Sequence, residues 1–259
     1  MGHADRFTVD RLTVVVHPDQ RSLAAAAAEQ AADGLRSAVA ARGTANAMFA
    51  TGNSQLAFVE TLTGLDGIPW SDVVAFHMDE YVGVGPDHPA GFRRWIRERI
   101  AERVHPDAVH YLDGTASDPD AECARYASLL ATHPLDLCCL GIGENGHLAF
   151  NDPPVADFAD RSDVKVVELD PACRAQQVGE GHFPGIEAVP TRAMTVTVPA
   201  LLRARQVVAV VPEERKAVAV HAALTGPVST GCPASALRTA PDATLHLDDR
   251  SAALLGRHA

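Results

Sequence analysis

Apolar residues along the chain fall into short blocks that alternate with longer stretches at helical spacing. Uninterrupted apolar blocks predict buried strands at residues 12–16, 45–50, 73–76, 135–140, 194–198, 207–211 and 244–247. Apolar residues at helical spacing predict helices at residues 23–41, 55–62, 91–104, 119–131 and 213–224. Strands that are apolar throughout and alternate with helices are typical of a mostly parallel sheet covered on both faces. The pattern therefore predicts an α/β fold.

One long stretch, residues 152–190, is only weakly periodic and contains several prolines and glycines. A long irregular segment inside a compact domain is often a lid or a binding loop. The sequence shows no internal repeat and no low-complexity linker. We therefore expect residues 1–259 to form a single domain in which residues 152–190 act as a lid or binding segment.

The composition is that of an ordinary globular protein, with 47% hydrophobic and 21% charged residues among 259. No apolar run approaches the ~18 residues of a membrane span, so no membrane association is expected. Residues 1–10 are charged and lack an apolar core, so a secretory signal is not expected. The five cysteines form no C-x-x-C pattern, which favours free thiols in a reducing cytoplasm.

The net charge of −11 excludes the most common mode of nucleic-acid binding, because an acidic chain repels a phosphate backbone. The longest basic cluster, residues 93–97, is diluted by the acids that follow it and is interpreted as a solvated helix face. A single small phosphate is still compatible with this charge, because one lysine and a few backbone amides can hold it.

Polar clusters follow the predicted strands at residues 51–55, 77–81 and 141–152, and Lys216 follows a fourth strand. Ligands of open parallel sheets bind beyond the carboxyl ends of the strands. We therefore expect these clusters to meet at one edge of the sheet and to form the functional site.

The first cluster, Thr51, Gly52, Asn53 and Ser54, joins a strand to a helix. Glycine allows close approach of the backbone to a ligand, and the amides of a helix N-terminus attract anions. Ser54 could equally be a plain N-cap, and the sequence is not that of a Walker loop. An anion-binding turn and a purely structural turn therefore both remain open.

Asp79 and Glu80 are adjacent on an extended segment, so their side chains point to opposite sides. One carboxylate can then face a pocket as a general base while the other faces a structural partner, although both could be solvated strand-end acids. His147 lies in a glycine-flanked turn, and Asp152 is placed to orient its imidazole. No familiar metal-ligand spacing includes these residues, so no metal is expected.

Two of these segments resemble the motifs of one enzyme family. Residues 76–83, F-H-M-D-E-Y-V-G, and the following His88 and Pro89 are similar to the F-x-M-D-E-Y-V-G…H-P motif of glucosamine-6-phosphate deaminases. Residues 141–153, G-I-G-E-N-G-H-L-A-F-N-D-P, resemble their G-x-G-x-D-G-H-I-A-F-N-E-P. The related 6-phosphogluconolactonases share only the glycine and histidine core, so Tyr81 and the N-D-P ending favour the deaminase branch.

The resemblance covers nearly the whole chain and implies a modified doubly wound, Rossmann-like three-layer sandwich. It also implies conversion of an amino-sugar 6-phosphate and water to a ketose 6-phosphate and ammonia, without a cofactor. His147 would open the sugar ring, Asp79 would move the proton between C2 and C1, and Asp152 would orient His147. The implied catalytic residues are Asp79, Asn145, His147 and Asp152. The implied substrate and phosphate contacts are Thr51, Gly52, Asn53, Ser54, Glu80, Gly146, Arg174 and Lys216.

Several positions depart from the family motifs. Asn145 and Asp152 stand where the family has aspartate and glutamate, and His77 replaces an asparagine. The family's phosphate-binding arginine belongs near Gln177, and Arg174 is the nearest basic residue. These departures leave open an isomerase that releases no ammonia, a lactonase-like hydrolase and a non-catalytic sugar-phosphate sensor. We further expect a small-molecule substrate and a homo-oligomer.

Overall fold

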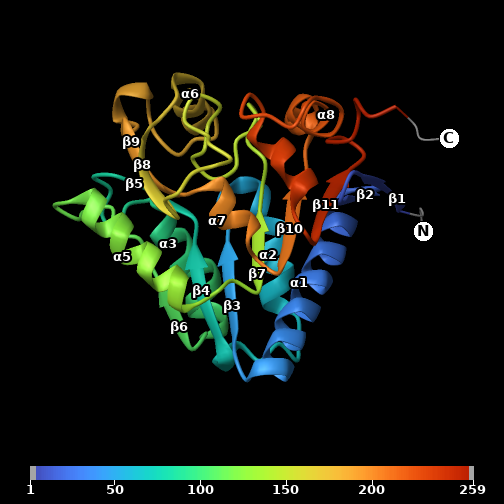
Figure 1. Ribbon diagram of the computed structural model, residues 1–259, viewed down its shortest axis with the longest axis horizontal. Coiled ribbons are helices and arrows are strands. Elements are labelled where there is room, and N and C mark those ends of the chain that lie inside the picture. Colours follow the sequence, from blue (N-terminus) through green and yellow to red (C-terminus); the bar gives the residue numbers. More distant parts are fainter. Residues whose placement is uncertain (1–3, 257–259) are drawn as a thin grey trace.

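The computed structural model describes residues 4–256, and its centre is an eight-stranded sheet (Figure 1). Its strand order is β1–β2–β11–β10–β7–β3–β4–β6, and every neighbouring pair is parallel except β1 and β2. The strands are β1 Asp5–Val9, β2 Leu12–His17, β3 Ala45–Phe49, β4 Val73–His77, β6 Ala108–His110, β7 Leu137–Leu140, β10 Gln206–Val211 and β11 Ala243–Asp248. The predicted mostly parallel sheet is confirmed. The first three residues of the charged N-terminal segment lie outside the described residues.

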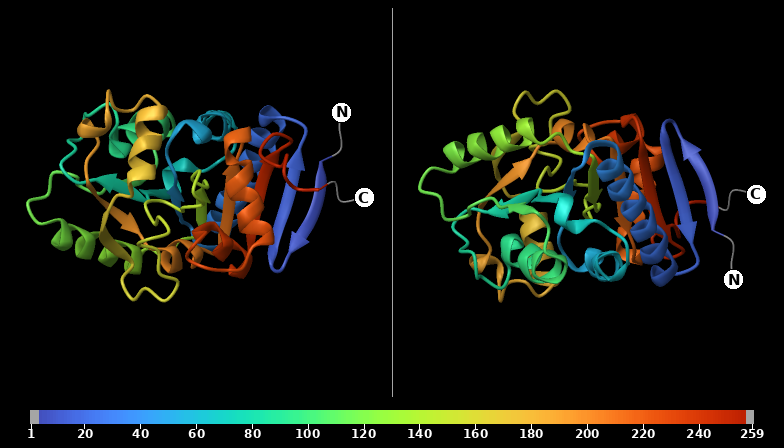
Figure 2. Two further views of the ribbon diagram at one scale, coloured as in Figure 1. Left: turned by 90° about the horizontal axis from the view of Figure 1, so that it is seen from above. Right: turned by 90° about the horizontal axis from the view of Figure 1, so that it is seen from below.

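Helices cover both faces of this sheet, as the two further views in Figure 2 also show. One face carries α1 Gln20–Arg42, α2 Leu56–Gly64 and a helical segment made of α3 Phe92–Ile96, a π-turn at Arg97–Ala101 and α4 Glu102–Val104. The other face carries α5 Pro119–Thr132, α7 Val198–Leu202 and α8 Ala217–Thr225. In β7, Cys138 and Leu140 pack into one core while Leu137 and Cys139 pack into the other. Burial on both faces explains why the central strands are apolar throughout.

A second, antiparallel sheet of three strands lies beside the first, in the order β5 Asp79–Tyr81, β9 Arg192–Val196 and β8 Val164–Glu168. The strand predicted at residues 194–198 therefore exists, but placing it in the parallel sheet was wrong. Residues 152–190 are also more regular than expected, because they contain β8 and the helix α6 Pro171–Gly179. Short strands such as β5 and β6 carry too few residues for a periodic signal.

The longest helix, α1, has clear sequence causes at both ends. The carboxylate of Asp19 accepts a hydrogen bond from the Ser22 amide at 2.7 Å, which caps the first turn. Gly43 ends the helix in the left-handed region, at φ 78°, where its N–H reaches the Val39 carbonyl. The buried face between these ends is mostly alanine, which lets α1 approach both α2 and the sheet closely.

His77 fixes the junction between the two sheets. It is fully buried at the end of β4, where its Nε2 accepts the Leu112 amide at 3.0 Å. Its Nδ1 therefore carries the proton and donates to the Asp79 carbonyl at 2.9 Å. Burial lowers the pKa of His77 to about 4, so the imidazole is neutral at pH 7. This histidine holds the backbone of Asp79 where the chain passes from β4 to β5.

The depressed pKa of His77 predicts a loss of stability in acid. Between pH 6.5 and pH 4 His77 is protonated in the unfolded chain but neutral in the folded chain. The free energy of unfolding therefore falls as pH falls. Replacing His77 with Gln should reduce the loss between pH 7 and pH 5 by roughly 2 kcal/mol, measured by urea unfolding. His246, whose pKa burial lowers to about 3, offers a second test through His246→Gln. His221→Gln, on an exposed position of α8, is the control, and equal pH profiles in all variants would contradict the prediction.

Candidate active site

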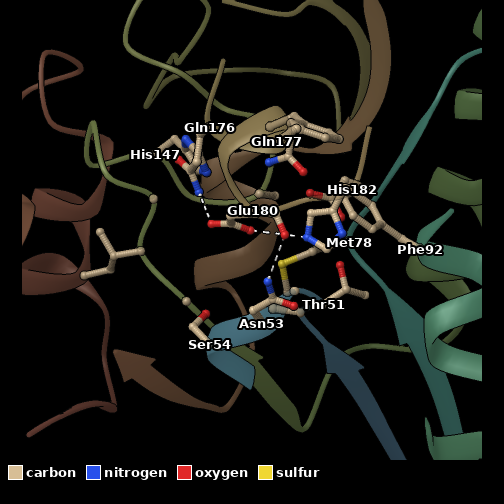
Figure 3. Close-up of a pocket in the computed structure, with 18 of the residues that line it drawn as sticks. Thr51, Asn53, Ser54, Met78, Phe92, His147, Gln176, Gln177, Glu180 and His182 are labelled. Carbon is tan, nitrogen blue, oxygen red and sulfur yellow. Dashed lines mark hydrogen bonds and ion pairs between the residues drawn. The ribbon is translucent and has the colours of Figure 1, made fainter. Parts of the chain in front are cut away.

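A pocket opens where β10, β7, β3 and β4 end, at the four clusters that the sequence singled out (Figure 3). Since these strands are neighbours and run parallel, their carboxyl ends share one edge of the sheet. The expected site residues that line the pocket are Thr51, Gly52, Asn53, Ser54, Asp79, His147 and Lys216. The structure thus brings together groups that are far apart in the chain.

The turn after β3 places its polar side chains at the pocket, where Asn53 donates to the Glu180 carbonyl at 3.5 Å and Ser54 accepts from Gln55 at 3.3 Å. Gly52 has φ 98°, in the left-handed region, and it leads into a short 3-10 turn at Asn53–Gln55 that precedes α2. Neither this turn nor α2 has a side-chain cap, so Ser54 is not an N-cap. Gln55 anchors the turn instead, because its Nε2 donates to the Val210 carbonyl of β10 at 3.0 Å.

Asp79 and Glu80 point to opposite sides of β5, as expected for adjacent strand residues. Asp79 lines the pocket. Glu80 is turned away, and its carboxylate accepts the backbone amides of Tyr81, Phe92 and Arg93 at 2.8–3.2 Å. Glu80 therefore anchors the N-terminus of α3 and does not reach the pocket that it was expected to line.

The two carboxyl groups have unusually high proton affinity. Burial raises the pKa of Asp79 well above its usual value, and the negative charge of Glu80 adds to the effect. Burial also raises the pKa of Glu80, to about 7, although its three amide donors oppose this. A carboxyl group with a raised pKa can both accept and return a proton, which is what a general acid–base catalyst does.

His147 stacks against Gly143, which follows β7 in the same loop. A Cβ atom at position 143 would lie 2.2 Å from the imidazole, so only glycine fits beneath this ring. The Nδ1 atom of His147 lies 3.0 Å from Oδ1 of Asp152, although the two are not aligned as a hydrogen bond. Catalytic contacts of this kind often tighten only when the substrate is bound.

Asn145 lies behind this pair and joins its two members. Its Nδ2 donates to Oδ1 of Asp152 at 2.8 Å, and its Oδ1 accepts the His147 amide at 3.1 Å. Burial favours a raised pKa for Asp152, but the nearby imidazole of His147 and the hydrogen bond from Asn145 outweigh it and hold the pKa below its usual value. Asn145 and Asp152 therefore support His147 from below and do not line the pocket. Gly146, at φ 84°, is likewise outside the lining and packs against Cys232.

Lys216 enters the pocket from the loop after β10. Glu213, at φ 82°, turns the chain there into the short 3-10 turn Glu214–Lys216. The Lys216 side chain is almost fully buried and has no hydrogen bond or ion pair with any residue in the described range 4–256. Burial lowers its pKa, with Arg215 adding to the effect. The charges of Glu180, Glu144 and Glu213 oppose this shift, but within the described residues none of them forms an ion pair with Lys216, so the ammonium is available to an anionic ligand.

The helix α6 supplies residues that the sequence analysis did not assign to the site. Gln176 and Gln177 line the pocket, together with Glu180 and His182 just beyond the helix (Figure 3). Glu180 accepts hydrogen bonds from Arg215 at 2.7 Å and from Gln176 at 2.8 Å, and His182 lies 3.3 Å away. Although burial opposes ionisation, these donors bring the pKa of Glu180 down to about 2.

Arg174 lies on another side of α6. Its guanidinium donates to the carbonyls of Ile186 and Val189, at 2.7 and 2.9 Å, and does not line the pocket. It therefore does not occupy the place of the missing phosphate-binding arginine. The spacing of these polar residues along α6 could have predicted their place in the site. Gln176 and Gln177 lie three and four residues after Cys173, and Glu180 follows at the end of the helix, so they share one face.

The fold and pocket together define a class of protein: an α/β sandwich whose pocket, at one edge of the sheet, holds a buried carboxyl group, an imidazole and a lysine. The chain belongs to the family of glucosamine-6-phosphate isomerases and 6-phosphogluconolactonases, whose model matches residues 18–246. The expected family resemblance and three-layer fold are confirmed.

Individual relatives agree with this assignment. The chain is 33% identical over 210 residues to glucosamine-6-phosphate deaminase of Exiguobacterium sibiricum, covering 81% of each chain. It is 34% identical over 209 residues to the protein of that name from Latilactobacillus sakei, covering 80% of this chain and 86% of the relative.

Solved structures show the same fold. A monomeric glucosamine-6-phosphate deaminase superposes with a TM-score of 0.85 at 29% identity, over 93% of this chain and 99% of that one. A 6-phosphogluconolactonase from Shewanella baltica has a TM-score of 0.75 at 22% identity, over 93% and 97% of the two chains. The second match speaks for the fold alone.

The hydrogen bond between Asn145 and Asp152 can be tested by replacing the amide of Asn145 with a charged carboxylate. Asn145→Asp places a second carboxylate at hydrogen-bond distance from Asp152, so the folded pair must share a proton. This raises the folded-state pKa, and the stability deficit relative to the wild type should grow as pH rises, reaching about 1–3 kcal/mol at pH 8. Urea unfolding at pH 5 and pH 8 measures it. Asn145→Ser, which removes the donor without adding charge, should show a deficit independent of pH; a similar constant deficit in Asn145→Asp would refute the prediction.

Proposed function

We propose that this protein is an amino-sugar 6-phosphate deaminase/isomerase. It would convert a glucosamine 6-phosphate-like substrate and water to a ketose 6-phosphate and ammonia. The observation that carries the proposal is one pocket in which Asp79, His147 and the unpartnered Lys216 converge. The names of the similar proteins support the same reaction.

Binding begins at the phosphate end of the substrate. Lys216 is a buried cation without a partner, and the turn at residues 51–54 offers uncapped backbone and polar side chains beside it. Holding the phosphate here fixes the sugar relative to Asp79 and His147. Orientation of this kind can lower the barrier of a later step by several kcal/mol.

His147 acts first, on the closed sugar ring. The reaction needs a proton delivered to the ring oxygen as the C1–O5 bond breaks and a proton removed from the C1 hydroxyl. Imidazole suits both transfers near neutral pH. Asp152, ionised because its pKa is held low, stabilises the protonated imidazole.

Asp79 acts next, on the open-chain aldehyde. The carboxylate removes the C2 proton and returns it to C1. The C1 oxygen gains a proton and the amino nitrogen loses one, so the amino aldehyde becomes a ketose imine at C2. Water then adds to C2, the C2–N bond breaks and ammonia leaves with the proton that balances it. The raised pKa of Asp79 lets one group accept and return the same proton.

The location and assembly of the protein belong to the proposal as well. Among residues 4–256, no helix is long and apolar enough to cross a membrane. The five cysteines are all free in the structure, which supports the cytoplasmic location that we propose. The homo-oligomer stays a prediction, and one similar solved deaminase is described as monomeric.

Replacing Asp79 with Asn should abolish deamination. The carboxamide cannot accept the C2 proton, so ammonia release from glucosamine 6-phosphate should fall by roughly 10²–10⁴-fold. A coupled assay for ammonia and exchange of the C2 proton in heavy water measure this loss. Asp66→Asn, at an exposed position, is the matched control.

Three other outcomes would each contradict the proposal. Ketose formation without ammonia indicates an isomerase. Lactone hydrolysis that survives Asp79→Asn indicates a lactonase-like hydrolase. Tight binding of amino-sugar phosphates without turnover or C2 exchange indicates a sensor.

Lys216 should govern recognition of the phosphate. Lys216→Met keeps the length and apolar stem of the side chain but removes the charge-assisted hydrogen bond, worth about 1.5–3 kcal/mol. We expect kcat/KM for the 6-phosphate to fall by roughly 10–100-fold, mostly through KM. Turnover of the unphosphorylated sugar should change little. Equal losses on both substrates would show that Lys216 does not read the phosphate.

A further inference from the structure

Cys173 lies in the first turns of α6 and faces the carboxylate beneath His147. Its side chain is buried, at 1% exposure, and its Sγ lies within 4.8 Å of both the His147 and the Asp152 ligand atoms. The same helix presents Gln176 and Gln177 to the pocket. Cys173 therefore places α6 next to His147 and Asp152.

The hydrogen bonds of Asp152 leave one oxygen unused. Oδ1 accepts the Asn145 amide and faces His147, whereas Oδ2 is buried and has no hydrogen-bond partner among the described residues. A buried carboxylate oxygen ordinarily has a donor, because leaving it unsatisfied costs about 1–3 kcal/mol or more. The thiol of Cys173 is the S–H group that faces this carboxylate.

The thiol keeps its proton in this environment. Burial raises the pKa of Cys173 well above the usual thiol value, and the adjacent charge of Asp152 raises it further. A protonated thiol is a donor, while a nucleophile or metal ligand must be a thiolate. The cluster of His147, Asp152 and Cys173 therefore suits a chain of hydrogen bonds better than a bound metal.

We propose that Cys173 is a positioning residue whose S–H donates to Oδ2 of Asp152 and so holds Oδ1 toward His147. The proposed hydrogen bond rests on a thiol within 4.8 Å of the carboxylate and on a buried oxygen of that carboxylate without a partner. Its catalytic consequence rests on the proposed function, in which Asp152 acts through His147. The donor comes from α6, so the orientation of Asp152 depends on how this helix is docked over the pocket.

The hydrogen bond can be observed without any substrate. The S–H stretch absorbs in an infrared window that is clear of other protein bands, and the wild-type minus Cys173→Ser difference isolates the Cys173 band. We expect this band at lower frequency than that of Cys139, a buried thiol with no carboxylate beside it, isolated in the same way with Cys139→Ser. Asp152→Asn should shift the Cys173 band and leave the Cys139 band unchanged. A Cys173 band that coincides with the Cys139 band, or that ignores Asp152→Asn, overturns the proposal.

Kinetics tests the consequence for the reaction. Cys173→Ala removes the donor, and we expect kcat to fall roughly five- to tenfold with KM unchanged, the size of one ordinary hydrogen bond, because S–H is a weak donor. Cys173→Ser restores an O–H donor and should recover most of the loss, whereas Cys139→Ala should have wild-type kinetics. Equal losses in the Ala and Ser variants would mean that Cys173 only fills space. If no amino-sugar phosphate is turned over, the proposed function fails while the infrared result still decides the hydrogen bond.

Discussion

Parallel pairing of four neighbouring strands, β10, β7, β3 and β4, is the constraint on which the site depends. The order places β7 at the centre, with a strand from the N-terminal half on one side and one from the C-terminal half on the other. Each strand is buried on both faces, so its polar residues can appear only where it ends. The carboxyl edge therefore gathers His147, Asp79 and Lys216 without any of them being neighbours in the chain.

The electrostatic environments of two carboxyl groups differ sharply: Asp79 lines the pocket, and Asp152 lies behind His147. Asp79 has apolar surroundings and Glu80 as a neighbour, so its pKa rises, whereas Asp152 has amide, imidazole and thiol partners, so its pKa falls. Opposite environments of this kind suit the two roles proposed for these residues, a proton carrier and a fixed negative charge. Tyr81 adds a mechanical link, because its hydroxyl donates to Gln177 of α6 at 2.8 Å and ties β5 to the helix over the pocket.

The sequence predicted the main sheet and the groups at its edge because both follow from strong local patterns. Long apolar blocks mark the central strands, and the motifs around Asp79 and His147 are long enough to be specific. The residues it missed depend at least in part on contacts that are distant in the chain. Glu180 belongs to the site because Arg215 and Gln176 hold it there, and Glu80 leaves the pocket because the amides of α3 compete for its carboxylate. No local pattern reports which of two adjacent acids finds such a partner.

The central position of β7 also affects when the protein can fold during its synthesis. Its two partners are β3 and β10, and β10 in turn pairs with β11, which ends at Asp248. Pairing between strands so far apart in the chain is slow, because closing the long intervening loops costs conformational entropy before any stabilising contact forms. A growing chain therefore cannot assemble the pocket until nearly all of it has left the ribosome. The apolar strand β3 can pair early with β4, but its other edge stays unpaired until β7 is made, so this interval is when the chain is most exposed to aggregation.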